Sequence, residues 1–332
     1  MSRFYRLAPR CSLTIRAMKE IELKFQVPPA AAAAVEAQLQ TAGATTIRLA
    51  ARYYDTADRR LAQAGFALRL RLEGTQWVQT LKGRAAGAAG LIERLEHNAA
   101  LPGVAALALP ELDLQRHAGT PAGMALQALL DAAGVGVDAL QIQYDTDISR
   151  LQHTIRHGAA GIELAFDRGL IRSGPRTLAV CELEFELLDG PRAELIAASR
   201  AWVQQLGLWL DVRSKAERGD RLARQLISGP VHQLPAVLAD AWPALLNQAL
   251  AALLPNLADL AGETATPEHA VALQQGAARF LQQLSTIDGV PAGLHAAAQT
   301  LAHAASGADV AAALRAVPLQ LAVLDLLGWG MG

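Results

Sequence analysis

The chain of 332 residues is poor in cysteine and in long apolar runs. It has two cysteines, Cys11 and Cys181, so we expect neither a disulfide framework nor a cysteine-based metal site. The longest apolar runs, such as 249–254, are too short to span a bilayer, and the N-terminus lacks the apolar stretch of a secretory signal. These absences predict a cytoplasmic protein with no membrane partner.

Net charge is also low, at −1 for the whole chain, which argues against nucleic acid as a partner. The charges are unevenly spread. Residues 1–19 carry basic side chains and no acidic ones, whereas residues 229–332 carry two basic side chains and seven acidic ones. We interpret residues 1–18 as an N-terminal extension that imitates a transit peptide, with Met18 as the expected native start.

What the chain does contain is a strict alternation of charged and apolar residues. Residues 20–25 read Glu-Ile-Glu-Leu-Lys-Phe. Successive side chains of a β-strand point to opposite faces, so Glu20, Glu22 and Lys24 would share one face of a strand. Taken alone, the pattern is more simply that of an edge strand with a solvated charged face.

Three further segments repeat the alternation: 67–72 with arginines, and 162–167 and 181–187 with carboxylates. Carboxylates crowded on one solvated strand face would repel one another. If the sheet closes, the charged faces point inward and line a lumen. Carboxylates in a lumen hold hard divalent cations, and arginine and lysine hold an anion. An anion that needs both is most simply a polyphosphate.

We therefore predict an α+β fold with an eight-stranded antiparallel closed β-barrel, or tunnel, and flanking helices. The strands are expected at 19–27, 47–54, 66–73, 76–82, 91–98, 143–157, 161–167 and 178–188. Turn-forming residues at 228–230 predict a domain boundary, so that 19–228 is the tunnel domain and 229–332 a small α-helical domain. Apolar residues at helical spacing predict the helices of that second domain near 231–253, 267–285, 291–305 and 308–316.

An ordered set of charged residues runs through the predicted tunnel domain. It comprises Glu20-x-Glu22-x-Lys24, Arg69-x-Arg71, Lys82, Arg94-x-Glu96, Arg150, Glu163 with Asp167, Glu182-x-Glu184-x-Glu186 and Ser214-Lys215-x-x-Arg218. This set resembles the CYTH superfamily, the triphosphate tunnel metalloenzymes, over about 19–228. In particular, the chain resembles bacterial inorganic triphosphatases, in which a CYTH domain precedes a helical CHAD domain. The resemblance implies an eight-stranded tunnel that binds a triphosphate together with Mg²⁺ or Mn²⁺.

The resemblance also implies roles for single residues. The metal-ligand candidates share hard carboxylate oxygens, and they are Glu20, Glu22, Glu182, Glu184 and Glu186. The triphosphate-binding candidates are all cationic, and they are Lys24, Arg69, Arg71, Lys82, Arg94, Arg150, Lys215 and Arg218. Lys24 and Glu22 are the catalytic candidates, with Lys24 positioning the attacking water beside the metal.

The expected function is hydrolysis of inorganic triphosphate to pyrophosphate and phosphate. The alternatives are hydrolysis of thiamine triphosphate, cyclisation of ATP as in class IV-type adenylate cyclases, and a polyphosphate-binding module with an idle tunnel. The C-terminal extension favours inorganic triphosphate, because relatives with the other activities usually have one domain. The acidic candidates argue against a pure binding module, since anion binding needs none of them.

Some charged residues have simpler interpretations. Glu96 and Glu163 would equally well neutralise neighbouring arginines, and Arg52 and Arg84 are expected to be solvated. The C-terminal region reads as a degenerate CHAD-like bundle, because it is nearly devoid of basic residues. Its histidines are expected on helix surfaces, and they are His232, His269, His295 and His303.

Overall fold

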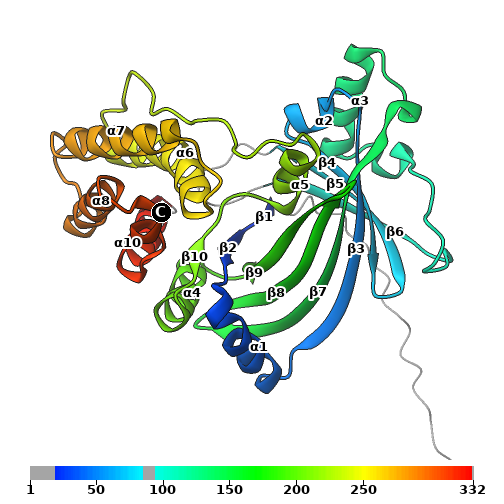
Figure 1. Cartoon of the computed structure of the whole chain (residues 1–332), viewed down its shortest axis with the longest axis horizontal. Helices are drawn as coiled ribbons and strands as arrows, with labels where there is room; N and C mark the ends of the chain where they lie inside the picture. The colour runs from blue at the N-terminus through cyan, green and yellow to red at the C-terminus, as the bar shows by residue number, and fades with distance from the viewer. Residues whose placement is uncertain (1–18, 85–93, 331–332) are drawn as a thin grey trace, which may run out of the picture.

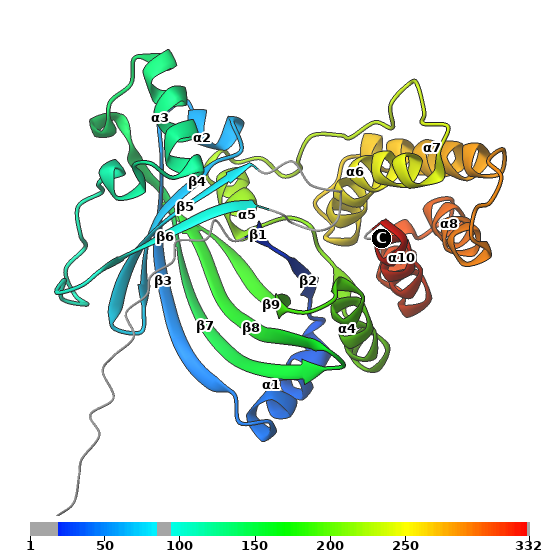
Figure 2. The ribbon, with the colours of Figure 1, turned by 180° about the vertical axis from the view of Figure 1, so that it is seen from behind.

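The computed structural model of the chain describes residues 19–84 and 94–330, without the side chains of residues 19, 20, 84, 94 and 95. The predicted N-terminal extension, and Met18 with it, lies outside this part. A strongly curved β-sheet forms the body of the molecule, and helices cover its outer face (Figure 1). A bundle of helices from the C-terminal third lies beside it, as the view from behind also shows (Figure 2).

Ten strands of the described chain form one antiparallel sheet, in the order β1-β6-β5-β4-β3-β7-β8-β9-β2-β10. They are β1 (Lys19–Glu20), β2 (Glu22–Gln26), β3 (Thr45–Asp55), β4 (Ala67–Glu73), β5 (Gln76–Arg84), β6 (Arg94–Leu101), β7 (Gln141–His157), β8 (Ala160–Ser173), β9 (Arg176–Asp189) and β10 (Trp209–Leu210). The predicted α+β class with a large antiparallel sheet is confirmed. The hydrogen-bonded order is open, so the closed eight-stranded barrel is not confirmed.

The first predicted strand is split by Ile21 into β1 and β2. β1 pairs with β6, whereas β2 pairs with β9. These partners lie far apart in the order of the sheet. One short segment of chain therefore runs along two separate parts of the sheet.

The register of the sheet brings charged side chains into rows. Glu22 of β2 lies opposite Glu186 of β9, which in turn lies opposite Glu163 of β8. In the next charged row, Lys24 lies opposite Glu184. Because side chains alternate with a period of two, a slip by one residue would exchange the charged and apolar faces.

The apolar residues of the same strands point to the outer face, which helices cover. Helices α1 (Ala32–Thr41) and α4 (Arg192–Leu206) pack with the apolar residues of β2, β8 and β9. Helix α3 (Pro121–Ala133) packs in the same way on β4 and β5. The rings of Phe25 and Phe185 meet edge to face on this side, with centroids 5.7 Å apart. Each fully buried ring of this kind contributes about 1.5–3 kcal/mol, which holds the register.

Helix α5 (Lys215–Ala223) lies on the inner face instead. The Ser214 hydroxyl accepts a hydrogen bond of 3.0 Å from the backbone N–H of Glu217 and so caps the first turn. The apolar side of α5 packs against Tyr53 and Tyr144 among the inward residues of β3 and β7. The helix therefore covers part of the charged face and presents its own first residue to it.

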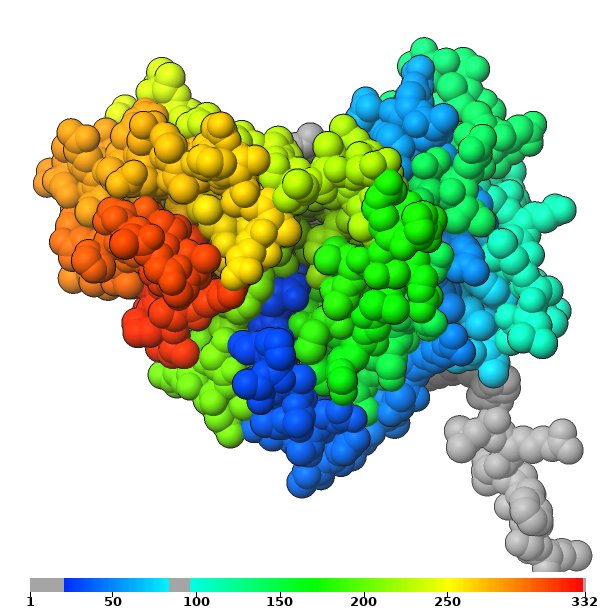
Figure 3. All heavy atoms as spheres, in the orientation of Figure 1, coloured from blue at the N-terminus to red at the C-terminus, as the bar shows by residue number. Residues whose placement is uncertain are grey.

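The C-terminal third forms a bundle of helices. They are α6 (Trp242–Ala261), α7 (Pro267–Leu284), α8 (Ala292–Ala305), α9 (Val310–Arg315) and α10 (Val317–Gly330). One apolar cluster runs from β2 and α4 into α6 and α10 without a break. Figure 3 shows the bundle, yellow to red, lying against the middle of the chain. The sequence analysis did not predict α10, and the predicted division at residue 228 stays a prediction.

The helix α6 is the one described helix that is long and apolar enough to cross a membrane, judged by length and composition alone. Within the protein, 67% of its most apolar window is buried, as in the core helix of a bundle. It overlaps the helix predicted near 231–253, and the predicted absence of a membrane partner stays a prediction.

Among the histidines of the bundle, His269 contradicts the predicted surface position. Its side chain is fully buried, and its Nδ1 accepts a hydrogen bond of 3.1 Å from the backbone N–H of Thr266 at the start of α7. His303 is exposed, and His232 and His295 are partly exposed. The ring of His269 therefore caps the start of α7 inside the bundle.

Gly219 offers a test of how tightly α5 is seated. A β-carbon at this position would overlap the ring of Tyr144, which stacks on Tyr53 with centroids 4.6 Å apart. We predict that Gly219→Ala lowers the free energy of unfolding by about 1–3 kcal/mol, because the overlap outweighs the roughly 1 kcal/mol by which alanine favours a helix. Chemical denaturation followed by circular dichroism measures the change.

Gly328 in α10 is the matched control. It is exposed, and a β-carbon there meets no atom within 4 Å. Gly328→Ala should be neutral or stabilising. If both variants unfold at the wild-type denaturant concentration, α5 is not packed as described.

Candidate active site

A cavity of about 660 Å³ lies on the inner, charged face of the sheet. Most of the predicted site residues line it, and they are Glu22, Lys24, Arg69, Arg71, Lys82, Arg150, Glu184, Glu186 and Lys215. Glu182 and Arg218 are not among the lining residues, and they form a buried ion pair with each other. Glu20 and Arg94 are paired through the backbones of β1 and β6, and their side chains lie outside the described part.

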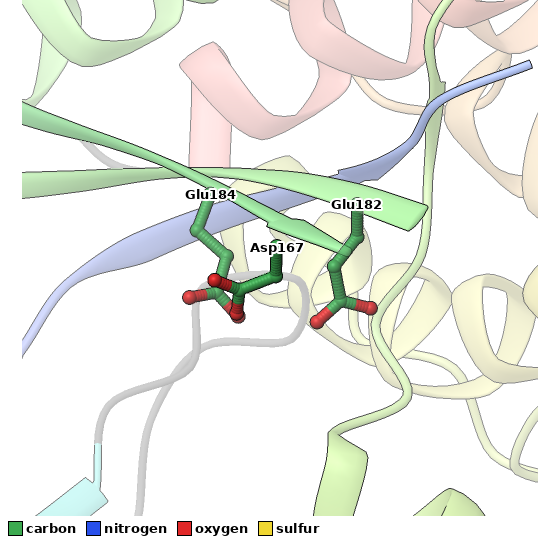
Figure 4. A group of neighbouring side chains, drawn as sticks. All are labelled: Asp167, Glu182 and Glu184. Atoms are coloured by element: carbon green, nitrogen blue, oxygen red, sulfur yellow. The ribbon is translucent and has the colours of Figure 1, made fainter. Parts of the chain in front are cut away.

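Three carboxylates gather beside α5. Asp167, Glu182 and Glu184 project from the same face of β8 and β9 (Figure 4), and one oxygen of each lies within 4.8 Å of the others. The Lys215 ammonium lies among them, 2.6 Å from Asp167 and 2.7 Å from Glu184, and it also pairs with Glu182. Arg150 donates to both oxygens of Asp167 at 2.7 Å and to Glu184 at 2.6 Å.

These contacts set the charge state of the group. Burial alone would raise the pKa of Glu184, but the Lys215 ammonium and the Arg150 guanidinium hold that pKa well below its usual range. The carboxylates likewise raise the pKa of Lys215. With Arg218 bound to Glu182, three cations face three carboxylates. The group is therefore neutral as a whole, although its oxygens are close enough together to hold a metal ion.

From the sequence, Asp167 is expected on a charged strand face, without a role in metal or triphosphate binding. The signal was present, since the alternation in 162–167 turns Asp167 to the same side as Glu163. Its pairing with Arg150 of β7 and Lys215 of α5 depends on strand register and on the docking of a helix. Neither can be read from local periodicity.

A second group of carboxylates crosses the sheet without cations. Glu163, Glu186 and Glu22 are direct neighbours on β8, β9 and β2. Within residues 19–84 and 94–330, none of the three makes an ion pair or a side-chain hydrogen bond. Burial and the charges of Glu163 and Glu22 raise the pKa of Glu186 to about 7. This row, named here the acidic row, therefore carries negative charge that nearby side chains do not neutralise.

Basic side chains crowd another part of the wall. Burial and the neighbouring cations Arg69 and Arg150 lower the pKa of Arg71, although its Nε donates to Glu73 at 2.7 Å. Arg69 donates to the hydroxyl of Tyr53 at 3.1 Å, a contact that the sequence analysis missed. Arginines held this close repel one another, so an anion between them would be stabilising.

Lys24 is almost completely buried, with 3% of its surface exposed. Its ammonium donates to the backbone carbonyl of Arg213, in the segment just before α5. Burial lowers its pKa, while the charges of Glu182 and Asp211 oppose this shift. Lys24 therefore touches both the cavity and the segment that carries α5.

Simpler interpretations were expected for two glutamates and two arginines, and the structure bears on three of these residues. Glu96 does neutralise a cation, since it pairs with Lys82 at 2.7 Å, though not with an arginine. Glu163 makes no such contact in the described part of the chain, and its charge acts on Arg150 from a distance. Arg52 is partly exposed and lies 3.5 Å from Asp145, as expected of a solvated residue. The side chain of Arg84 lies outside the described part.

Part of the chain is similar in sequence to a curated protein. The inorganic triphosphatase of Haemophilus influenzae is 28% identical over 207 residues, which are 61% of this chain and 54% of the relative. The chain thus spans about half the length of that curated relative.

Two solved structures are similar at low identity. A protein from Hippeastrum, described as a putative adenylyl cyclase with a dominant triphosphatase activity, has a TM-score of 0.45 and 19% identity over 62% of this chain and 96% of its own. A putative adenylate cyclase from Bacillus halodurans has a TM-score of 0.40 and 18% identity over 60% of this chain and 96% of its own.

The family match is the decisive finding. Residues 18–219, more than half of the chain, match the CYTH domain. The matched range contains the cavity-lining residues, from Glu22 to Lys215 and Ala216. The chain therefore belongs to the CYTH domain family.

Proposed function

We propose that the protein is a metal-dependent triphosphatase that hydrolyses inorganic triphosphate to pyrophosphate and phosphate. The observation that carries the proposal is one cavity lined both by the acidic row and by crowded arginines. The acidic row needs a cation, and the arginines need an anion. A polyphosphate with bound metal supplies both. The name of the Haemophilus influenzae relative supports inorganic triphosphate as the substrate.

We infer that the cavity is a tunnel. Support comes from residues 19–26, because β1 pairs with β6 while β2 pairs with β9. Without β1, β2 and β10, those two partners, β6 and β9, would be the edge strands of the remaining sheet. The chain between them is Ile21 alone. The first predicted strand thus joins the two borders covalently around the cavity.

The acidic row fits a divalent cation by its chemistry. Its donors are all carboxylate oxygens, which suit Mg²⁺ or Mn²⁺. Glu22, Glu163 and Glu186 would hold the ion, with Glu20 as a further candidate from the sequence. When bound, the ion polarises the phosphoryl group and neutralises charge that develops on it. Glu182 and Glu184 were also expected to bind metal, but their cationic partners favour a different role, which is to hold Lys215, Arg150 and Arg218 in place.

The cationic residues of the cavity would bind the triphosphate. Inorganic triphosphate carries roughly four to five negative charges near neutral pH, so several cations are needed to bind it. Arg69, Arg71 and Arg150 offer planar guanidinium groups, which match phosphate oxygens two at a time. An anion among them would offset the burial and the repulsion that together lower the pKa of Arg71. Lys82 and Lys215 add charge that they share with Glu96 and with the carboxylates beside α5.

Lys24 and Glu22 are the proposed catalytic pair. They lie two residues apart on one face of β2, and both line the cavity. The contact with the Arg213 carbonyl fixes the Lys24 ammonium, which would then donate hydrogen bonds to the attacking water or to a phosphoryl oxygen. Glu22 would hold the metal ion beside that water. Most of the expected rate enhancement is therefore electrostatic and positional.

We further propose that residues 229–332 are a degenerate CHAD-like bundle with little affinity for polyphosphate. Both of its arginines are used within the protein. Arg279 donates to the carbonyls of Pro235 and Ala236, at 3.0 and 3.1 Å. Arg315 pairs with Glu263 at 2.7 Å. Seven acidic residues surround these two arginines in the sequence, which disfavours a polyanion.

Phosphate release tests the reaction. With Mg²⁺ or Mn²⁺, the wild type should hydrolyse inorganic triphosphate faster than thiamine triphosphate or ATP, and a chelator should abolish the activity. Glu22→Gln should be slower by at least about a hundredfold, since losing a metal-centred electrostatic contribution costs several kcal/mol. The exposed Glu268 of the bundle supplies the control, and Glu268→Gln should be fully active.

Two outcomes would change the assignment. A preference for thiamine triphosphate or for ATP would replace the substrate. If no triphosphate is hydrolysed with either metal, the triphosphatase hypothesis is wrong, and the alternative of a binding module takes its place.

Arg71 tests anion binding. Arg71→Ala should raise the KM for inorganic triphosphate by about 10- to 100-fold, the expected cost of one or two hydrogen bonds between charged groups. Arg48 is the matched control, because it is exposed and pairs with Asp147 at 3.0 Å. Steady-state kinetics of Arg48→Ala should match the wild type. Equal KM changes in the two variants would show that Arg71 acts only through overall charge.

Glu186 tests the acidic row without any activity measurement. In metal-free protein, Glu163→Gln should lower the pKa of Glu186 from about 7 toward the ordinary value near 4.5, because a like charge is removed. Added Mg²⁺ should lower it as well. Carboxyl ¹³C NMR titration measures both effects. An unchanged pKa of Glu186 in Glu163→Gln would show that the charge of Glu163 does not act on Glu186.

The same group should make stability depend on pH. Because the pKa of Glu186 is raised in the folded state, protonation favours folding. Its stabilising contribution is complete below about pH 4.5 and is lost as the pH rises through about 7. Glu186→Gln should remove this dependence from the free energy of unfolding of metal-free protein.

A further inference from the structure

The helix α5 brings two cations to the active site. Lys215 and Arg218 reach the carboxylates of β8 and β9, so the position of α5 decides where these charges lie. The segment before α5 also matters, because the carbonyl of Arg213 accepts the hydrogen bond from Lys24. Whatever holds this segment and this helix holds three of the candidate site residues.

One side chain of the bundle contacts both ends of α5. Asp259 of α6 is fully buried, and its Oδ1 accepts from Arg213 at 3.2 Å and from Arg221. Arg213 directly precedes the Ser214 cap of α5, and Arg221 lies in the last turn of the helix. The hydroxyl of Thr264 donates to the same Asp259 oxygen at 2.9 Å.

The guanidinium groups are tightly enclosed at this junction. A β-carbon at Gly262 would overlap the guanidinium of Arg213, and one at Gly229 would overlap that of Arg221. His269 is also fully buried, with its Nε2 3.8 Å from Asp259 Oδ2. There is thus little room for either arginine to adopt another position while Asp259 holds it.

Arg213 transmits this constraint to β2. Its guanidinium also binds Asp211 with two hydrogen bonds of 2.8 and 2.9 Å. The backbone N–H of Asp211 donates to the carbonyl of Lys24 at 2.9 Å, and Lys24 in turn donates to the carbonyl of Arg213. A shift of the Arg213 guanidinium would therefore disturb the residues that fix the Lys24 ammonium.

We propose that Asp259 is a positioning residue of the active site, which acts from the helical bundle through Arg213 and Arg221. It holds α5 so that Lys215 lies in the cavity wall and Arg218 pairs with Glu182, and it keeps Lys24 on the Arg213 carbonyl. The proposal rests on the proposed function, since it assigns the bundle a part in binding the triphosphate. Apolar contacts alone would join the bundle to the sheet. A buried ion network specifies one geometry between them, although removing its charges from water costs free energy.

The test uses the full chain with Asp259→Asn, which keeps the shape and removes the charge. Steady-state kinetics with inorganic triphosphate and Mg²⁺ give kcat and KM. Titration calorimetry with inorganic triphosphate in a chelator gives anion affinity without hydrolysis. We expect kcat/KM to fall, and the dissociation constant to rise, by about 10- to 100-fold, the usual effect of displacing binding groups by about 1 Å.

Double variants separate positioning from general damage. If Asp259 acts through α5, adding Asp259→Asn to Lys215→Met should change the affinity for inorganic triphosphate little further. Added to Arg71→Ala, on the other part of the wall, it should have nearly its full effect. Leu324→Ala is the stability control, because Leu324 lies in the shared apolar cluster outside the ion network. It should lower the denaturation midpoint and leave the affinity unchanged.

Thr264→Val is the second variant, in case Asp259→Asn does not fold. It removes the hydroxyl that accepts from Arg213 at 2.6 Å and should weaken anion binding in the same direction, by a smaller factor. The proposal is overturned if folded Asp259→Asn binds with wild-type affinity, if its effect adds fully to Lys215→Met, or if Leu324→Ala loses affinity equally. Wild type that binds triphosphate without hydrolysing it overturns the proposed function alone, and wild type that does not bind it overturns both.

Discussion

The neutral ion cluster beside α5 is the interaction on which the rest of the structure depends. Asp167, Glu182 and Glu184 are nearly or fully buried, and a buried carboxylate without a partner costs several kcal/mol. The strands can turn these charges inward only because Arg150 and Lys215 compensate them. The sheet and α5 are therefore mutually dependent, since neither can be rearranged without leaving a buried charge unpaired.

The proposed function resides in the charges of the cavity that lie outside this cluster. The acidic row and the crowded arginines lie in the same cavity, and within each group charges of like sign lie close together. Such arrangements destabilise the unliganded protein and are stabilised by ligands of opposite charge. A chain selected only for stability would pair Glu163 or Glu186 with a cation, as it pairs Glu184.

The inward charges also determine what surrounds the sheet. Since the inner face is ionic, the outer face carries the apolar side chains and has to be covered. Helices α1, α3 and α4 cover it, and the cluster on α4 continues into α6 and α10. The bundle is thus joined to the sheet by a common core, and Asp259 adds a polar contact that reaches the active site. This connection explains why α10, which is apolar on most sides, is stable next to α4.

By itself, the sequence determined the strands apart from β10, with β1 and β2 taken as one, and the face on which their charged side chains lie. Alternation sufficed for this, because the direction of a side chain relative to its own strand is a local property. Glu22, Lys24, Arg71 and Glu186, which share charged strand faces in the sequence, line one cavity, whereas Glu182 does not. Only the tertiary structure decided which charges compensate one another, as with Lys215 among three carboxylates and Asp259 between two arginines. Those partners come from segments far apart in the chain, and strand register and helix docking, which local patterns do not encode, bring them together.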